Sequence, residues 1–444
     1  MKIRLMKTRI IESLYHRTSP AAPSFDAWEN PAHVHTVIVG AGFAGINTAL
    51  GLAERGISAL VLEQNSVGFG ASGRNGGFVF AGYSLGERAL LDALGASLAK
   101  AWYQRTQAAV NLIRERIQRY AIACEAVDAG VLWANWFANG EVLSARQSLL
   151  REHFASDWRT VTQAELATML NTTHYSGALF ERNALHLNPL KLIRGLAEAA
   201  RTQGARIVEQ VQVESVTPIV NTSDTSRRWR VTTNHGTVEC AHVVLACGGY
   251  LAGKLAQNQT ALSHAVLPIA TYVIATEPLG ARLNDVINTD AAVYDTRFAF
   301  DYYRATPESR IVWGGRINVS DAAPEQVTKM LTTDMIRVYP QLKDVKIEYA
   351  WSGLMSYATH EMPQIGQTQP GLWHAQAFGG HGLAPCCVAG ETLASAIAAG
   401  DLSYLELKQF GLTRTFGALG LAAAQTKYWW LQSLDWWRTQ AGVK

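Results

Sequence analysis

Residues 40–45 read Gly-Ala-Gly-Phe-Ala-Gly and directly follow the apolar run 34–39. A second apolar run, 60–62, ends at Glu63, 23 positions after Gly40. A strand, a glycine turn, a helix and a second strand that ends in an acid form the context that a dinucleotide-binding unit requires. The sequence therefore predicts a parallel α/β sheet whose first turn binds a nucleotide, rather than a glycine turn that only packs.

Each position of this motif has a physical reason. Gly40 permits the tight turn, Gly42 lets the backbone approach a pyrophosphate, and Gly45 lets the helix pack closely on the strand. The unpaired N–H groups at the helix start attract phosphates, and Glu63 would accept hydrogen bonds from ribose hydroxyls. We predict cofactor contacts from the turn and from the end of the second strand: Gly40, Gly42, Phe43, Ala44, Gly45, Glu63 and Gln64.

Composition narrows the class of protein. The chain has 444 residues, of which 48% are hydrophobic and 17% charged, so we expect a globular protein of two interleaved domains. A formal net charge of +3 gives no support to nucleic-acid binding. The five cysteines have no metal-ligand spacing, which predicts free thiols in a reducing compartment and no metal site. We expect a cytoplasmic protein, or one that is peripheral on the inner membrane if the basic N-terminal residues or the C-terminal tail lie on its surface.

Three further glycine-rich segments lie in the chain. Residues 68–77 hold five glycines in ten positions, a loop that can lie flat against a planar ligand. The apolar run 241–246 ends in Cys-Gly-Gly, which is typical of a strand returning to a dinucleotide site. Residues 379–382, Gly-Gly-His-Gly, precede a helix rich in small residues and predict a second anion or dipole site.

Residues 266–316 have the alternation of antiparallel strands. Phe298, Phe300 and Tyr302 share one face of such a strand. This aromatic face is either core or the wall of a substrate cage. We expect the sheet to cover a substrate site.

These segments together resemble the FAD-dependent D-amino-acid oxidase and sarcosine oxidase (DAO) superfamily over about residues 34–400. The loop Ala-Ser-Gly-Arg-Asn-Gly-Gly (71–77) and the run Asp-Tyr-Tyr-Arg (301–304) are most similar to the γ-glutamylputrescine oxidase branch. The resemblance implies an α/β fold in which a Rossmann-like FAD-binding domain is interleaved with an antiparallel-sheet substrate domain. The expected divisions are a basic lead-in (1–33), the FAD-binding domain (34–90, 186–260 and 345–400), the substrate domain (91–185 and 261–344) and a Trp-rich helical tail (401–444).

The resemblance implies FAD rather than NAD. Relatives with covalent flavin carry a cysteine near residues 351–359, which contain none here, so we expect noncovalent FAD. Besides the residues of the first turn, the implied FAD contacts are Ser72, Arg74, Asn75, Gly76, Gly77, Val213, Gly248, Gly380, His381, Gly382 and Leu383. Sarcosine oxidases use a lysine to activate oxygen on a strand that here reads Ile-Val-Trp-Gly (311–314), so both O2 and a quinone stay open as electron acceptor.

The implied chemistry is oxidative deamination, in which a C–H beside a neutral amine nitrogen passes hydride to flavin N5 and water hydrolyses the imine. The candidate catalytic residues are His381, Tyr302, Trp313, Tyr357 and Arg304. Arg304 or Arg316 could hold a substrate carboxylate, and Asp301 or Glu361 a second ammonium group. The main prediction is an oxidoreductase for a small amine such as a γ-glutamylated polyamine. The alternative is a membrane-associated dehydrogenase of a secondary amino acid (proline, pipecolate or sarcosine) that passes electrons to quinone.

The tail carries two Trp pairs, 429–430 and 436–437, at helical spacing. Such a helix either packs on its own domain or a partner chain, or lies at a membrane interface. A flavin-bearing RNA-modifying protein, the rival of another class, would need a basic stripe that the sequence lacks.

Overall fold

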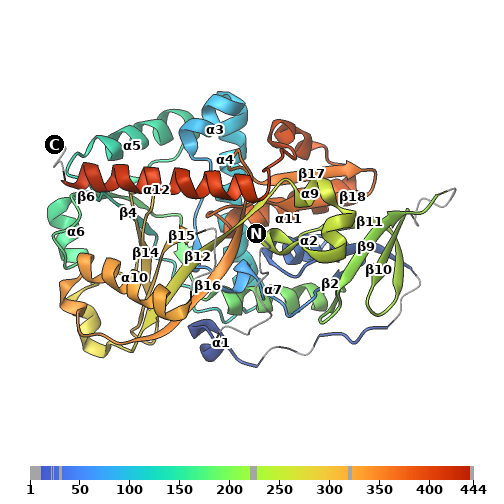
Figure 1. Ribbon diagram of the computed structural model, residues 1–444, viewed down its shortest axis with the longest axis horizontal. Helices are drawn as coiled ribbons and strands as arrows, with labels where there is room; N and C mark the ends of the chain where they lie inside the picture. The colour runs from blue at the N-terminus through green and yellow to red at the C-terminus, as the bar shows by residue number, and fades with distance from the viewer. Residues whose placement is uncertain are drawn as a thin grey trace.

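The computed structural model describes residues 12–21, 23, 25–29, 33–220, 228–318 and 323–440. Two eight-stranded sheets form two halves that lie side by side (Figure 1). One half has a parallel centre and the other is mostly antiparallel, which confirms the predicted fold class. The basic residues expected in the N-terminal lead-in lie outside the described residues.

The first sheet is built around β1. This strand pairs in parallel with β2 and β11, so that Val39 lies beside Leu62 and Leu245. The three strands therefore end together, as a dinucleotide site requires. The sheet has the order β17-β18-β11-β1-β2-β8, and β9 and β10 extend it as a hairpin. Its strands are β1 (His33–Val39), β2 (Ala59–Leu62), β8 (Arg206–Val208), β9 (Val213–Pro218), β10 (Trp229–Thr233), β11 (Thr237–Leu245), β17 (Gln364–Gln369) and β18 (Leu372–Gln376).

Helices cover one face of this sheet. Every residue of α2 (Phe43–Ala53) is buried, and α2 packs against α7 (Pro189–Thr202) and α11 (Leu383–Ala399). A Cβ at Gly390 would lie 2.5 Å from the Cβ of Asn47, so only glycine allows α2 and α11 to approach this closely. The remaining helices of this half are α1 (Leu14–Thr18), α3 (Glu87–Leu94), α4 (Ala96–Arg119), α8 (Gly253–Asn258) and α9 (Thr260–Ser263), with 3-10 turns η1 (Ala71–Gly73), η2 (Gly248–Tyr250) and η5 (Ser403–Phe410).

The second sheet has the order β16-β12-β15-β14-β13-β4-β6-β5. All of its pairs are antiparallel except β13 with β4. Its strands are β4 (Val131–Ala134), β5 (Arg159–Thr162), β6 (Gly177–Glu181), β12 (Leu267–Thr276), β13 (Ala292–Asp295), β14 (Tyr302–Ala305), β15 (Ile311–Asn318) and β16 (Ile347–Tyr357). Around it lie α5 (Glu141–Phe154), α6 (Gln163–Met169) and α10 (Pro324–Val338), with η3 (Gly280–Asp285) and η4 (Pro340–Leu342); the ribbon β3 (Phe78–Val79) with β7 (Leu185–His186) is separate.

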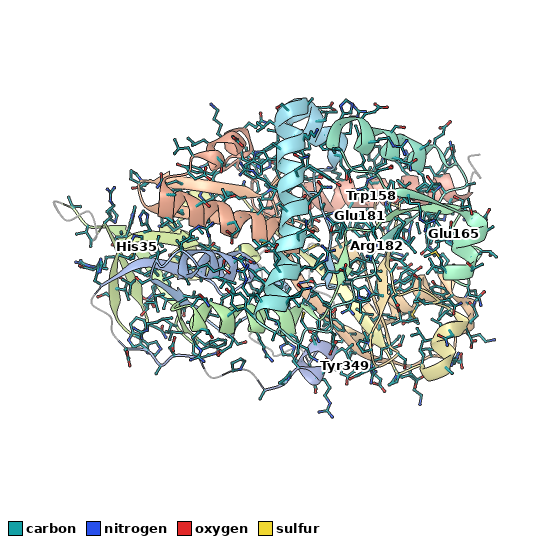
Figure 2. All side chains as sticks on the ribbon, turned by 180° about the vertical axis from the view of Figure 1, so that it is seen from behind. His35, Trp158, Glu165, Glu181, Arg182 and Tyr349 are labelled. Carbon is teal, nitrogen blue, oxygen red and sulfur yellow. The ribbon has the colours of Figure 1, made fainter. Side chains whose placement is uncertain are left out.

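Two segments differ from the expected division of the chain. Strand β16 pairs along its length with β12, so residues 347–357 lie in the second sheet, whereas the predicted boundary at residue 345 would put them in the FAD-binding part. Helix α4 was expected in the substrate part, yet it packs on α11 because buried Arg116 pairs with Glu54 and Glu391. Seen from behind, α4 runs between the two halves (Figure 2).

The tail forms α12 (Ala418–Gln440), which lies across the second half (Figure 1). None of the helices among the described residues has the length and apolar character that crossing a membrane would need.

Candidate active site

A cavity of about 1060 Å³ opens between the two halves. The ends of β1, β2 and β11, the η1 loop and the start of α11 line it from the first half, while β12, β15, β16 and α12 line it from the second. Both sheets therefore contribute to a single elongated space.

The glycine turn forms one wall. Gly40 has a φ of +104°, and a Cβ there would lie 2.7 Å from the carbonyl oxygen of Ala246. A Cβ at Gly45 would lie 2.0 Å from the oxygen of Gly40, so Gly45 serves the packing of α2 and does not line the cavity. The other predicted residues of this turn, Gly40, Gly42, Phe43 and Ala44, do line it.

Glu63 lies at the end of β2 with its carboxylate held by the backbone. The Ala41 N–H donates to Oε2 at 2.8 Å, and the Asn65 N–H donates to Oε1 at 2.9 Å. Burial raises the pKa of Glu63, and these two hydrogen bonds oppose the rise. Each oxygen keeps a second lone pair for a ligand hydroxyl. Gln64 lines the cavity beside it.

The second glycine-rich loop is fixed by its own polar side chains. Ser72 Oγ accepts the Phe43 N–H at 2.9 Å, which ties the loop to the start of α2. Asn75 donates to the carbonyls of Ala71 and Ser72 and accepts the Gly77 N–H at 2.8 Å. The predicted residues Ser72, Arg74, Asn75 and Gly76 line the cavity, as do Val213 and Gly248. Gly77 does not line it; its φ of +80° serves the turn.

The start of α11 closes the other end. Gly382 is its N-cap and supplies no side chain to the free N–H groups of the first turn. Gly380, His381, Gly382 and Leu383 all line the cavity. Burial lowers the pKa of His381 to about 4, helped by Arg146 and opposed by Glu87, so this imidazole is neutral at physiological pH. Its ring packs edge-on against Phe80, with the ring centroids 4.6 Å apart.

Aromatic side chains surround the space next to α11. Tyr302 and Tyr357 line the cavity, and burial raises the pKa of both hydroxyls, so they stay protonated. Tyr302 lies over Gly314, where a Cβ would be 2.2 Å from its ring. Phe80 and Tyr294 complete this wall. Phe298, Phe300 and Tyr302, the predicted aromatic face, all line the cavity, but only Tyr302 lies in a strand, β14, and Phe300 and Tyr302 also pack against the buried cluster around Tyr294.

Two predicted catalytic residues do not line the cavity. Strand register pairs Trp313 with Tyr303, and the two rings stack 4.3 Å apart on the face opposite Tyr302. Arg304 is buried beneath the η1 loop, where its Nε donates to the Gly76 carbonyl at 2.8 Å and an Nη donates to Tyr15 Oη at 3.3 Å. Trp313 is engaged in packing and Arg304 in hydrogen bonds away from the cavity lining, and their catalytic role stays a prediction.

The remaining charged candidates differ in position. Arg316 and Glu361 line the cavity. Arg316 donates through Nε and Nη2 to Asp334, at 2.7 and 2.6 Å. Asp301 does not line it; it is buried against Arg297 at 2.6 Å, and burial raises its pKa to about 7.

Sequence reasoning missed part of the lining. Tyr294 and Phe80 stand at the aromatic end, and Gly420, Ala424 and Tyr428 of α12 form a wall there. The alternating aromatic residues at positions 78 and 80 could have predicted that Phe80 lines the cavity. No local pattern tells that a helix some 400 residues from the start covers the same space.

The donor set fits a flavin dinucleotide. The cavity joins an acid-bearing dinucleotide turn to a second helix N-terminus, and the N-cap residues of α2 and α11, Gly42 and Gly382, have no side chain to cap these helices. Such N-termini favour negative charge on phosphate or on a reduced ring. Burial raises the pKa of the Cys247 thiol, which lines the cavity, to about 12.

Comparison with known proteins agrees with this geometry. Residues 35–396 match the family model of FAD dependent oxidoreductases known as DAO. The chain is 31% identical over 379 residues to a probable oxidoreductase OrdL of Haemophilus influenzae, covering 83% of this chain and 84% of that protein. It is 30% identical over 399 residues to γ-glutamylputrescine oxidoreductase of Escherichia coli, covering 87% and 89%.

Solved structures share the fold. L-Proline dehydrogenase from P. horikoshii superposes with a TM-score of 0.71 at 17% identity, covering 86% of this chain and all of the other. Glycine oxidase from Geobacillus kaustophilus gives 0.69 at 21% identity, covering 87% and 100%.

Proposed function

Since this chain belongs to the DAO family of FAD-dependent oxidoreductases, we propose that it catalyses the oxidative deamination of a small amine most like γ-glutamylputrescine. As a member, it is an oxidoreductase of the class that acts on amines and amino acids, and it holds FAD noncovalently. One observation carries the proposal: a single cavity joins the dinucleotide turn to an aromatic compartment at the start of α11.

In this proposal the glycine turn and Glu63 hold the adenosine and pyrophosphate part of FAD. Ser72, Arg74, Asn75 and Gly76 follow its linker, and Val213 and Gly248 contact its adenosine end. Residues 380–383 hold the ring, which supplies a hydride acceptor when bound. The free N–H groups of α11 favour negative charge there.

The aromatic compartment prepares the amine. Phe80, Tyr294, Tyr302 and Tyr357 exclude water, and desolvation lowers the pKa of an alkylammonium, so the amine loses its proton more readily. His381 is neutral, so it adds no positive charge that would repel a substrate ammonium group or attract a substrate carboxylate. No described side chain in this compartment is needed as a strong base.

The position of the cations favours an amine whose carboxylate is remote. Next to the start of α11, the lining side chains Met355, Tyr357 and His381 carry no positive charge. Arg316 lies further away, because β12 separates its strand, β15, from β16, which carries Met355 and Tyr357, and strands two apart stand roughly 10 Å from each other. An α-amino acid has its carboxylate one carbon from the reacting nitrogen, whereas a γ-glutamyl amine has it many bonds away.

The alternative function is a membrane-associated dehydrogenase of proline, pipecolate or sarcosine that passes electrons to quinone. Four exposed tryptophans on α12 support this alternative function. Under the main proposal the enzyme is cytoplasmic and the acceptor is O2.

The test is anaerobic reduction of the bound flavin, followed by its visible absorption. γ-Glutamylputrescine, putrescine, proline, pipecolate and sarcosine are compared, and air or a soluble quinone is then admitted. Fast bleaching by γ-glutamylputrescine supports the proposal, and faster bleaching by a secondary amino acid supports the alternative. A flavin that none of these reduces refutes both.

A matched pair of variants tests the carboxylate site. Arg316→Gln is expected to raise KM for γ-glutamylputrescine about tenfold or more while leaving KM for putrescine unchanged. Arg310→Gln is the control, because Arg310 pairs with Glu308 and Glu348 away from the cavity. Equal effects of Arg316→Gln on both substrates would refute the remote carboxylate.

A further inference from the structure

Helix α12 presents an unusual outer face. Trp429, Trp430, Trp436 and Trp437 are each 60–64% exposed. Positions seven apart share a helix face, so the four rings form two neighbouring rows on the outer side of α12, 429 with 436 and 430 with 437, which together we call the tryptophan strip. Leu419 extends it toward the start of the helix. Exposed apolar surface of this kind on a folded protein marks an interaction site.

The opposite face of α12 is firmly attached. The Asp435 carboxylate accepts the Phe298 N–H at 2.9 Å, and Tyr428 Oη accepts the Ile317 N–H at 3.3 Å. Leu421 and Tyr428 are buried. The tryptophan strip is therefore held in place by the fold and does not belong to a detached tail.

The exposed charges of residues 411–440 are basic, although one of them, Lys427, is paired with Glu361 at 3.2 Å. Arg414, Lys427 and Arg438 are exposed, whereas Asp435, the single acid among residues 411–440, is buried beneath the helix. The indole ring is apolar with one polar N–H, and it accumulates where hydrocarbon meets lipid headgroups. Basic side chains beside such rings add attraction to anionic lipids.

The same helix is a wall of the cavity. Gly420, Ala424 and Tyr428 line it from the inner side. A surface that binds the tryptophan strip would thus lie one helix diameter, roughly 10 Å, from the substrate compartment.

We propose that the tryptophan strip docks this protein on the surface of an anionic lipid bilayer, so that the outer face of α12 lies against the headgroups. The proposal adds a partner to the proposed function and holds for either substrate class. Docking uses the outer face alone, so the cavity keeps its shape.

Sedimentation of the holoenzyme with vesicles tests this. Vesicles of phosphatidylcholine with phosphatidylglycerol are expected to bind the protein and shift its tryptophan fluorescence to shorter wavelength; vesicles of phosphatidylcholine alone bind it more weakly. Replacing the four tryptophans by Gln is expected to lower binding to the anionic vesicles at least about 100-fold, because most of the buried apolar area is lost.

Two controls separate loss of vesicle binding from other effects of the substitutions. The exposed apolar residues Leu402 and Leu405 lie outside α12, and changing both to Gln should leave vesicle binding unchanged. Flavin content and substrate reduction without vesicles are measured for each variant, so a failure of the proposed function shows up separately.

The proposal is overturned if the protein binds neither kind of vesicle. It is also overturned if the variant with all four tryptophans replaced binds the anionic vesicles like the wild type. Light scattering of the protein without vesicles tests whether the strip binds a second copy of this chain. A dimer that the Trp→Gln changes abolish would assign the strip to a second copy of this chain instead.

Discussion

Glu181, on β6 in the second half of the molecule (Figure 2), makes the free energy of unfolding depend on pH in an unusual direction. Burial raises the pKa of this carboxyl from 4.5 to about 8; Arg146 opposes the rise and Glu87 adds to it. Arg146 cannot offset burial because it already donates to Glu87 at 2.6 Å and to Tyr294 at 3.2 Å. Glu181 Oε2 has no partner among the described residues.

The sign follows from proton binding. Between pH 4.5 and about 8 the folded protein keeps the Glu181 proton while the unfolded chain has lost it, so the free energy of unfolding falls as pH rises. The slope is about 1.4 kcal/mol per pH unit well below pH 8 and half of that at pH 8, so the loss between pH 6 and pH 8 is about 2 kcal/mol. Glu181→Gln stays neutral in both states and removes this contribution.

The measurement is urea unfolding of wild type and Glu181→Gln, with FAD at saturation, at pH 6 and pH 8. Any constant cost of the substitution cancels in the comparison between the two pH values. The variant is expected to gain about 2 kcal/mol on the wild type over this interval. Glu165→Gln is the control, because Glu165 is exposed and pairs with Arg159, and it should leave the pH dependence unchanged. Parallel pH dependence of wild type and Glu181→Gln would refute a neutral buried carboxyl.

Three other outcomes are expected. Glu63→Gln replaces an acceptor of two backbone N–H groups by an amide that can accept only one of them, so FAD affinity should fall about tenfold or more in a fluorescence titration; unchanged affinity would remove Glu63 from the site. Gly77→Ala puts a Cβ against backbone, whereas Gly86→Ala, with almost the same φ, meets nothing within 4 Å; thermal unfolding should show a large loss for the first and about 1 kcal/mol for the second, and equal losses would contradict this packing. Trp313→Phe should lower stability with KM unchanged, while Tyr302→Phe should change KM; the reverse result in steady-state kinetics would return Trp313 to the cavity.

The cofactor half of the molecule was readable from sequence because its constraints are local. Gly40 needs a positive φ and free space, and Glu63 ends a strand that the same short unit positions. The glycine-rich loop of residues 68–77 is similarly self-contained, since Asn75 and Ser72 bind backbone groups a few residues away or at the first turn. Spacing along the chain is then enough to predict where these groups lie.

The substrate half required the tertiary structure. A one-residue step along a strand changes the face on which a side chain lies, so sequence could not tell that Tyr302 faces the cavity while Trp313 packs on Tyr303. At Arg316 a β-bulge and a φ of +57° redirect the side chain. No sequence pattern in β15 predicts this change of direction.

The sequence by itself determined that the chain builds a dinucleotide site, because that motif is a property of about thirty consecutive residues. Only the tertiary structure decided what completes the site: β16 joins the second sheet, and α12 folds back over the cavity with its tryptophans outward. These arrangements bring together residues hundreds of positions apart. The free energy that stabilises these arrangements comes from surfaces that meet only after the chain has folded. No periodic pattern in the sequence therefore predicts them.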